Sequence, residues 1–270
     1  MFFRKLLHEI FCVPYNAMSI GKGGFYRNLK YKVLKNIFFD NIFKLNLTPI
    51  EKKRLYSNCL SFIGTNWIEG DYYEFGTFEG TSFIDTYKGI QEKIENPNSK
   101  NKGLRMHMYG FDSFEGLPEI TTLDKHYTGN DKQKWQQGQM AYDIDNFIKL
   151  MDKNGLSRDK YTLIKGFYND SLKPEIIEQH HMRKAALINI DCDLYQSTVE
   201  VLQFIKPLLQ TGTIIIFDDY FHFNGDRNKG EAKAFREFLD TNKEFTAIDY
   251  MQYGWCGKAF IINVDGANDN

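Results

Sequence analysis

The sequence predicts an α/β fold in which most strands of one sheet run parallel and alternate with helices. Two apolar runs, residues 185–190 and 213–217, read as buried strands because each is rich in isoleucine and too short for a helix. Apolar residues recur at helical spacing between them. A third run, residues 72–75, leads into a glycine-rich turn and another helix. This repeated order is typical of a parallel sheet covered by helices.

Length, composition and charge narrow the class of protein. The 270 residues are 42% hydrophobic and 16% aromatic, enough for a substantial core, and the formal net charge is -1. Because no basic excess is available to neutralise phosphates, we expect no nucleic-acid partner. The four cysteines have no C-x-x-C spacing, so we expect a reducing compartment, the cytoplasm.

We divide the chain into a helical N-terminal extension, residues 1–48, and one α/β domain, residues 49–270. Residues 2–11 form an amphipathic stripe whose charges exclude a signal peptide, and no stretch is long enough to span a membrane. The stripe offers a contact for a membrane, a partner subunit or the domain itself. The glycine cluster at residues 21–24 reads as a hinge or loop, because it lacks the flanking features of a phosphate loop.

The domain is predicted to open with a helix. Thr48 and Glu51 have the spacing of a capping box, with Pro49 between them in the first turn. Apolar side chains at positions 55, 59, 60 and 63 would cover the sheet.

The first strand, residues 72–75, runs into an E-x-G-x-x-x-G pattern formed by Glu74, Gly76 and Gly80. A helix is expected to begin near Ser82, with its free N–H groups facing the turn. Glycines allow a ligand to approach the backbone closely, although many strand-to-helix turns use glycine for geometry alone.

The second strand, residues 106–111, ends at Asp112. In doubly wound folds an acid at this position commonly accepts hydrogen bonds from ribose hydroxyls, so we expect an adenosine moiety across these two strand ends. The alternative is that Asp112 starts a turn ahead of Ser113.

A long polar connection, residues 119–159, reads as a lid or substrate wall, or as a plain surface insertion, and ends in a short helix at residues 145–153. The third strand, residues 161–165, follows. Gly166 and Phe167 come directly after it, where they would flank a purine ring.

The helix between the two isoleucine-rich strands has its own start and stop signals. Ser197 and Glu200 have capping-box spacing, and Pro207 predicts that the helix kinks or loosens in its last turn. After the last of these strands, a helix through Ala232, Phe235 and Phe238 and two strands, paired antiparallel, complete the sheet. We expect those strands at residues 245–250 and 258–264.

Three aspartates follow the isoleucine-rich strands, Asp191 after the first and Asp218 with Asp219 after the second. Crossovers of this kind are right-handed and their strands are often neighbours, so the three carboxylates should meet at one sheet edge. Crowded carboxylates repel each other unless a cation lies between them, and oxygen ligands favour Mg²⁺ over zinc. The alternative is that Asp218 and Asp219 cap a turn while Asp191 meets a lysine.

Taken together, the motifs resemble the macrocin O-methyltransferase-like family of class I S-adenosylmethionine-dependent methyltransferases. The resemblance covers roughly residues 49–238 and is carried, in order, by EFGTFEGTS, YGFDSFEGLPE, GQMAYDIDNFIKLMDKNGL, INIDCDLYQST and IIIFDDY. It implies a Rossmann-like fold with a mostly parallel seven-stranded sheet and helices on both faces. It also implies methyl transfer from S-adenosylmethionine to a sugar hydroxyl with the help of a divalent metal, usually Mg²⁺.

Matched position by position, the resemblance implies a cofactor site and a metal site. The cofactor residues would be Glu74, Gly76, Thr77, Gly80, Ser82, Asp112 and Ser113. Gly166 and Phe167, expected beside the purine from their place after the third strand, would complete this cofactor site. The metal ligands would be Asp191, Asp218 and Asp219.

Methyl transfer from a sulfonium is an in-line displacement, so the protein must hold the acceptor hydroxyl close to the methyl carbon and make its proton easier to remove. Asp191 or His222 would receive that proton, while Asp193 and Tyr195 would shape the acceptor pocket. We expect a sugar or glycan acceptor, either a glycoconjugate, a nucleotide sugar or a glycosylated natural product, and a homo-oligomeric enzyme.

Two other functions fit parts of the sequence. The DCD motif at residues 191–193 has the D-x-D form with which metal-dependent glycosyltransferases bind nucleotide sugars. A non-catalytic methyltransferase-like scaffold that docks through its N-terminal stripe is the second alternative.

Overall fold

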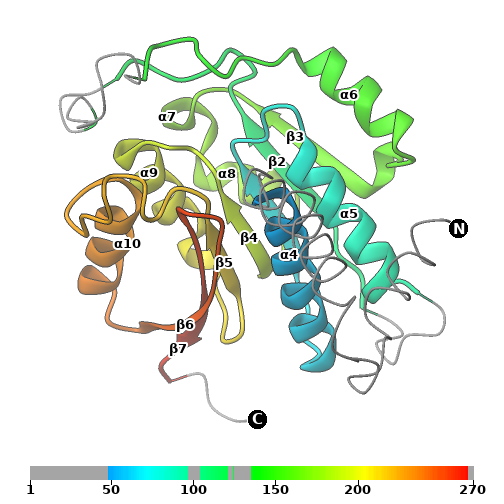
Figure 1. The fold of residues 1–270 in the computed structure, drawn as a ribbon. Coiled ribbons are helices and arrows are strands. Elements are labelled where there is room, and N and C mark those ends of the chain that lie inside the picture. Colours follow the sequence, from blue (N-terminus) through cyan, green and yellow to red (C-terminus); the bar gives the residue numbers. More distant parts are fainter. Residues whose placement is uncertain (1–47, 97–103, 121–123, 125–134, 267–270) are drawn as a thin grey trace, which may run out of the picture. The chain divides into compact units, whose positions relative to one another are not determined.

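The computed structural model describes residues 48–96, 104–120, 124 and 135–266 (Figure 1). The chain divides into two compact units, residues 1–47 and 48–270. Several sequence predictions lie outside the described residues, namely the stripe at residues 2–11, the glycine cluster at residues 21–24, the structure of the N-terminal extension and much of the predicted lid.

The second unit contains one seven-stranded sheet in the order β3-β2-β1-β4-β5-β7-β6. Neighbours among β1 to β5 pair parallel, while β7 pairs antiparallel with both β5 and β6. The predicted α/β class and the antiparallel closing pair are therefore confirmed. The strands are β1 (Asp71–Phe75), β2 (Met108–Asp112), β3 (Tyr161–Lys165), β4 (Ala185–Ile190), β5 (Ile214–Phe217), β6 (Phe245–Tyr253) and β7 (Gly257–Val264).

Helices lie on both sides of the sheet, with α4 and α5 on one side and α9 and α10 on the other (Figure 1). None of the described helices has the length and apolar character needed to cross a membrane. The helices are α4 (Thr48–Thr65), α5 (Thr81–Lys93), α6 (Ile144–Lys153), α7 (Tyr168–Ser171), α8 (Pro174–Gln179), α9 (Tyr195–Ile205) and α10 (Gly230–Thr241), with 3-10 turns η3 (Arg158–Lys160) and η4 (Lys206–Leu208).

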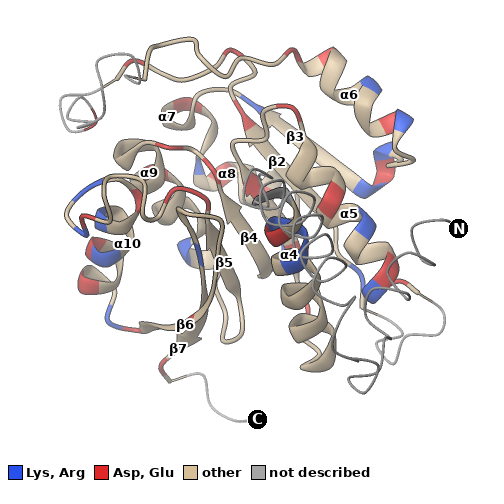
Figure 2. Cartoon of the chain, in the orientation of Figure 1, with Lys and Arg blue, Asp and Glu red and all other residues tan. Residues whose placement is uncertain are grey.

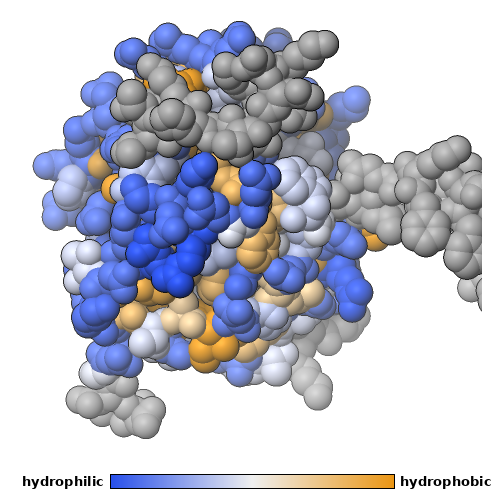
Figure 3. All heavy atoms as spheres, turned by 60° about the vertical axis from the view of Figure 1, so that its left-hand side comes forward, coloured by the Kyte–Doolittle hydropathy of each residue, from blue (hydrophilic) through white to orange (hydrophobic). Residues whose placement is uncertain are grey.

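Two hydrophobic clusters fill the space between the sheet and the helices. Successive side chains of a strand point to opposite faces, so Tyr72 joins the cluster beneath α4 and α5, and Tyr73 joins the cluster beneath α9 and α10. All six residues of β4 are buried, as expected for a central parallel strand. On the face shown in Figure 3 hydrophilic residues predominate, and hydrophobic residues appear in patches between them.

The helix between β4 and β5 starts earlier than predicted, so the predicted capping box is wrong. Ser197 lies inside α9 and is buried, and the residue before the helix is Leu194, which makes no side-chain capping bond. Asp193, with a left-handed backbone at φ 61, already turns the chain into the helix. The effect of Pro207 is confirmed, because the α-helix gives way to the 3-10 turn η4 there.

The strand β2 begins two residues later than predicted and includes Asp112. Its register, and that of its neighbours, brings the strand ends level, with pairs Phe75–Phe111, Phe75–Ile190 and Ile190–Phe217. The residues that lie next to one another along this edge are therefore Gly76, Asp112, Asp191 and Asp218. The strand order reverses between β1 and β4, and in open α/β sheets ligands bind at such a reversal, outside the carboxyl ends of the strands.

Candidate active site

The glycine turn after β1 is clamped by the acid at the end of β2. Oδ2 of Asp112 accepts hydrogen bonds from the backbone N–H groups of Thr77 at 2.8 Å and Phe78 at 3.0 Å, and from the Thr77 hydroxyl at 3.2 Å. Oδ1 accepts one from the backbone of Phe114 at 2.7 Å. Asp112 thus joins the turn to the β2 loop, which agrees with the turn-starting role considered as the alternative for this residue.

The glycines of the turn are required by close contacts with other elements. A Cβ on Gly76, whose φ is +83°, would lie 1.8 Å from the backbone oxygen of Asp191. A Cβ on Gly80, with φ +74°, would lie 2.7 Å from side-chain atoms of both Phe147 and Met151 on α6. Gly76 therefore allows β1 and β4 to end side by side, and Gly80 allows α6 to cover the turn.

Glu74 lies beneath the glycine turn with no exposed surface. Its carboxylate accepts hydrogen bonds from the hydroxyls of Tyr72 and Ser82, one from its own strand and one from the first turn of α5. Burial raises the pKa of Glu74 to about 7, against the lowering effect of these two donors. Two predicted cofactor residues, Glu74 and Ser82, are therefore in contact with each other.

The other predicted cofactor residues lie at the neighbouring strand ends. The Ser113 hydroxyl donates to the carbonyl of Gly116 at 2.7 Å, within the loop after β2. The N–H of Gly166 donates to the carbonyl of Asp112 at 2.9 Å, which places Gly166 and Phe167 beside this loop. The predicted cofactor residues are thus brought together around the ends of β1, β2 and β3.

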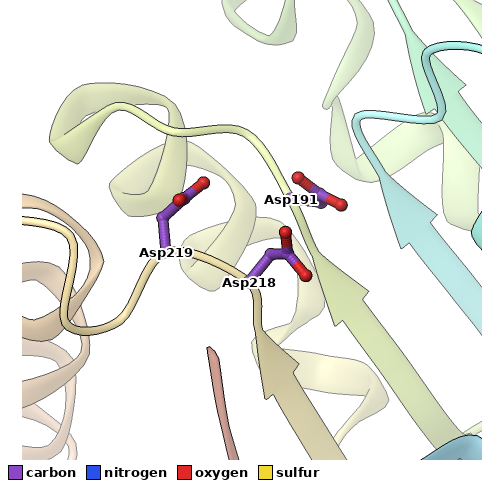
Figure 4. Close-up of side chains that lie close together, drawn as sticks. All are labelled: Asp191, Asp218 and Asp219. Atoms are coloured by element: carbon purple, nitrogen blue, oxygen red, sulfur yellow. The ribbon is translucent and has the colours of Figure 1, made fainter. Parts of the chain in front are cut away.

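The three predicted metal ligands converge at the adjacent ends of β4 and β5 (Figure 4). One carboxylate oxygen from each of Asp191, Asp218 and Asp219 lies within 4.8 Å of the others. The parallel pairing of the two strands produces this proximity, since Asp191 follows Ile190 and Asp218 follows its partner Phe217.

A lysine from α4 lies between two of these carboxylates. Nζ of Lys52 is 2.6 Å from Oδ1 of Asp218 and 3.0 Å from Oδ2 of Asp191. The Tyr253 hydroxyl, at the end of β6, also donates to Oδ1 of Asp218. Burial alone would lower the pKa of Lys52, but Asp191 and Asp218 hold it well above its usual value. Figure 2 shows basic and acidic residues next to each other near the start of α4, the helix that carries Lys52.

Further titratable groups surround Asp219. Nδ1 of His222 donates a hydrogen bond to Oδ1 of Asp219 at 3.0 Å. The backbone N–H of Asp219 donates to Oε2 of Glu231 on α10 at 2.9 Å. Burial, followed by the charge of Asp219, raises the pKa of both Asp193 and Glu231 well above the usual value.

This donor set fits a hard divalent cation. Burial, and next the charge of Asp218, raises the pKa of Asp191 to about 8, so its charged form needs a nearby cation. Oε1 of Glu231 is buried and has no hydrogen-bond partner among the described residues. Carboxylate oxygens at this spacing are the ligands that Mg²⁺ or a similar ion prefers.

Aromatic rings line the side of the site near His222. Its ring centroid is 5.7 Å from that of Trp135 and 5.3 Å from that of Trp255, with interplanar angles of 31° and 43°. Trp255, in the turn between β6 and β7, is 66% exposed. Nε1 of Trp135 is buried and has no hydrogen-bond partner among the described residues.

The sequence profile of the macrocin-O-methyltransferase (TylF) family matches residues 40–256, well over half of the chain. The chain belongs to this family. The predicted resemblance is thereby confirmed, and the profile covers the glycine turn, the loop after β2 and the carboxylate cluster.

Two proteins with sequences similar to this macrocin-O-methyltransferase family member are O-methyltransferases from bacteria. The 8-demethyl-8-(2,3-dimethoxy-alpha-L-rhamnosyl)-tetracenomycin-C 4'-O-methyltransferase of Streptomyces olivaceus is 26% identical over 176 residues, 64% of this chain and 62% of the relative. The mycinamicin III 3''-O-methyltransferase of Micromonospora griseorubida is 26% identical over 179 residues, 64% of this chain and 65% of the relative. The aligned region therefore spans less than two thirds of the length of either relative.

The solved structure of the O-methyltransferase NovP has the same fold. It superposes with a TM-score of 0.62 at 19% identity, covering 78% of this chain and 79% of that chain. The similarity confirms the predicted class I methyltransferase fold for the described sheet and helices.

The structure adds residues to the site of this family member that the sequence reasoning missed. Lys52 carried a signal, because it lies three, four and seven residues before the buried Leu55, Tyr56 and Cys59 and so shares their face of α4. A lysine on an apolar helix face needs an anion. Tyr253 had no comparable signal, since its contact with Asp218 depends on where a distant turn folds.

Proposed function

We propose that this chain is an O-methyltransferase that moves a methyl group from S-adenosylmethionine to a hydroxyl of a sugar. In this proposal Asp191, Asp218 and Asp219 hold a divalent cation. The observation that carries the proposal is a glycine-rich strand-to-helix turn beside a carboxylate cluster, at adjacent strand ends of one parallel sheet. Membership of the macrocin-O-methyltransferase family supports the same reaction.

The donor is proposed to bind across the ends of β1, β2 and β3. When bound, S-adenosylmethionine supplies an electrophilic methyl group on a sulfonium, and the role of the protein is to orient it. Oδ1 of Asp112 accepts a single backbone hydrogen bond, so it keeps the capacity to accept another from a ribose hydroxyl. Gly166 and Phe167 would flank the purine, and the remaining contacts would come from Gly76, Thr77, Gly80 and Ser113. Glu74 and Ser82, predicted as direct contacts, are bonded to each other beneath the turn and would support it from there.

The sugar acceptor is supported by the aromatic rings beside the carboxylates. Flat apolar rings such as those of Trp135 and Trp255 pack well against the C–H faces of a sugar ring, while a buried indole N–H offers a hydrogen bond to a hydroxyl. The S. olivaceus relative is named for a rhamnosyl compound. Together these observations favour a glycosylated acceptor over a flat phenol.

The cation is proposed for the position where the three aspartates converge. There it would act as a Lewis acid that makes the acceptor hydroxyl easier to deprotonate. Asp191, Asp218 and Asp219 would fix the cation, and Mg²⁺ is the ion that their oxygen donors favour.

His222 is proposed to receive the acceptor proton. Asp219 accepts a hydrogen bond from Nδ1 of His222 and so orients the imidazole. Asp191, the other predicted base, already contacts Lys52 and lies among the proposed cation ligands, so holding charge is its better-supported role.

Other features of the chain stay predictions. We propose a cytoplasmic homo-oligomer in which residues 2–11 contact a membrane or a partner, and the region at residues 119–159 forms a wall of the acceptor pocket. Residues 2–11 lie outside the described part of the chain.

The proposal is tested by replacing Asp191 and Asp218 with asparagine and measuring transfer of labelled methyl groups to a panel of rhamnosides, other glycosides and nucleotide sugars. We expect transfer to fall by more than about 1,000-fold, because several kcal/mol of charge stabilisation are lost. Binding of S-adenosylmethionine should largely survive, and EDTA should reproduce the loss in the wild type. The matched control replaces two exposed acids on and near α10, Asp226 and Asp240, with asparagine.

Calorimetry with S-adenosylmethionine and with a nucleotide sugar separates this proposal from its rivals. Binding of the nucleotide sugar without S-adenosylmethionine would favour a glycosyltransferase that uses residues 191–193. Full transfer by the double variant in the presence of chelator would remove the cation from the mechanism. If neither ligand binds, the non-catalytic scaffold is the better description.

A further inference from the structure

Lys52 is the basic residue that contacts two of the proposed cation ligands, and it reaches them from the buried face of α4. Only 20% of its side chain is exposed, whereas the side chain of its neighbour Lys53 is 62% exposed and pairs with Asp85 at 3.5 Å. Successive residues of one helix turn thus have different surroundings. Lys52 is held inward against Asp191 and Asp218, and Lys53 lies on the surface.

The residue before Lys52, Glu51, fixes the first turn of α4 to another part of the fold. Oε2 of Glu51 accepts a hydrogen bond from the backbone N–H of Gly254 at 2.7 Å, in the turn between β6 and β7. The residue before that glycine, Tyr253, donates its hydroxyl to Asp218. The same turn therefore fixes both the start of α4 and one of the two carboxylates that Lys52 contacts.

Lys52 leaves one oxygen of each carboxylate for another partner. It contacts Oδ2 of Asp191 and Oδ1 of Asp218. Among the described residues, no hydrogen bond or ion pair reaches Oδ1 of Asp191 or Oδ2 of Asp218. A divalent ion at these two oxygens would therefore share both carboxylates with the ammonium group of Lys52.

We propose that Lys52 competes with the divalent cation for the negative charge of Asp191 and Asp218, and so weakens cation binding. This inference rests on the cation of the proposed function. The ammonium group and the cation draw on the same two carboxylates within a few ångströms of each other, and like charges at that range repel strongly. Even at an effective dielectric constant of about 20, this repulsion exceeds the roughly 1.4 kcal/mol that corresponds to tenfold in affinity.

This competition would make binding of the divalent cation readily reversible. An ammonium that neutralises part of the cluster keeps Asp191 and Asp218 together before a divalent ion binds, and it makes that ion exchangeable. Removing the ammonium should therefore have two opposite effects: tighter binding of the divalent ion, and a less stable protein when no divalent ion is added.

The test measures Mn²⁺ binding to the full-length protein by electron paramagnetic resonance, without S-adenosylmethionine or acceptor. We expect Lys52→Met to bind Mn²⁺ at least about tenfold more tightly than the wild type, and Lys52→Gln to behave in the same direction. Lys52→Arg keeps the charge and should bind close to the wild type. Lys53→Met is the matched control, because it removes a lysine of the same helix turn that contacts Asp85 instead, and it should leave binding unchanged.

Thermal unfolding gives a second readout and shows that the variants are folded. Without divalent ions Lys52→Met should melt below the wild type, and saturating Mn²⁺ should raise its melting temperature by more than it raises that of the wild type. Unchanged or weaker Mn²⁺ binding by both neutral variants overturns the inference, and so does the absence of Mn²⁺ binding in every variant. The first of these results leaves the proposed methyl transfer intact, while loss of S-adenosylmethionine binding would defeat methyl transfer without changing the role of Lys52.

Discussion

At the scale of single residues, Glu74 supports the glycine turn after β1 from beneath. Its carboxylate is fully buried and holds Ser82 at the start of α5 through a hydrogen bond. The pKa of Glu74, raised by burial from 4.5 to about 7, means that the folded protein binds a proton here that the unfolded chain has released. The charge of Glu74 is thus a cost to folding near neutral pH.

Replacing Glu74 with glutamine should remove this cost. The contribution of Glu74 to stability is fully present below pH 4.5 and is lost as the pH rises through about 7, because the folded-state pKa lies above the unfolded value. The unfolding free energy of the wild type should therefore fall by up to about 3 kcal/mol relative to Glu74→Gln over this range. Urea unfolding at a series of pH values measures the difference.

The control for this measurement is Glu92→Gln, which makes the same change at an exposed side chain of α5. Parallel stability curves for the wild type and Glu74→Gln would contradict the prediction, since they would mean that Glu74 titrates alike in the folded and unfolded chain.

At the scale of elements, α6 closes the glycine turn from the side. Phe147 is fully buried and its ring lies 5.9 Å from that of Phe83 on α5 and 5.8 Å from that of Phe114 after β2. The same ring is one of the groups that a side chain at Gly80 would meet. A short helix thus joins the first turn of α5 to the loop after β2.

Phe147→Ala should destabilise the protein by about 3–5 kcal/mol, because it removes a buried ring and leaves a cavity next to the turn. Affinity for S-adenosylmethionine should fall as well, since the turn loses its lateral support. Lys149→Ala, at an exposed position of the same helix, is the control. Denaturant unfolding together with calorimetry of cofactor binding tests both effects, and a wild-type affinity in Phe147→Ala would show that α6 does not shape the turn.

At the scale of the whole molecule, the described fold and both halves of the proposed site belong to the unit of residues 48–270. The sheet, its two hydrophobic clusters and the carboxylate cluster all draw on this unit. A chain that begins at residue 48 should therefore fold alone in one cooperative transition, with a melting temperature within about 4 °C of the full chain, the shift expected for roughly 1 kcal/mol.

Calorimetry of the shortened chain measures the melting transition, and its binding of S-adenosylmethionine reports on the site. Loss of a cooperative transition would place part of the folding energy in residues 1–47. Because the family profile begins at residue 40, a chain that starts at residue 40 should be measured beside the one that starts at residue 48. A difference between the two would assign the effect to residues 40–47.

The sequence predicted most of the fold because its strands are local patterns. The runs at β3 and β4 were placed with the correct bounds, and Asp191 and Asp218 were predicted to meet because each follows a strand of one crossover. The start of α9 was missed because the left-handed turn at Asp193 has no periodic signal. The fixed geometry of parallel strands turned sequence positions into neighbours in space.

The sequence by itself therefore determined the α/β class, the strand ends and the acids that occupy them, because these follow from hydrophobic period and turn chemistry within short segments. Only the tertiary structure decided which groups face those acids. Lys52 contacts a carboxylate 139 residues further along the chain, and Tyr253 reaches Asp218 from β6. Such contacts depend on how α4 and the β6–β7 turn pack against the sheet, which no local pattern specifies.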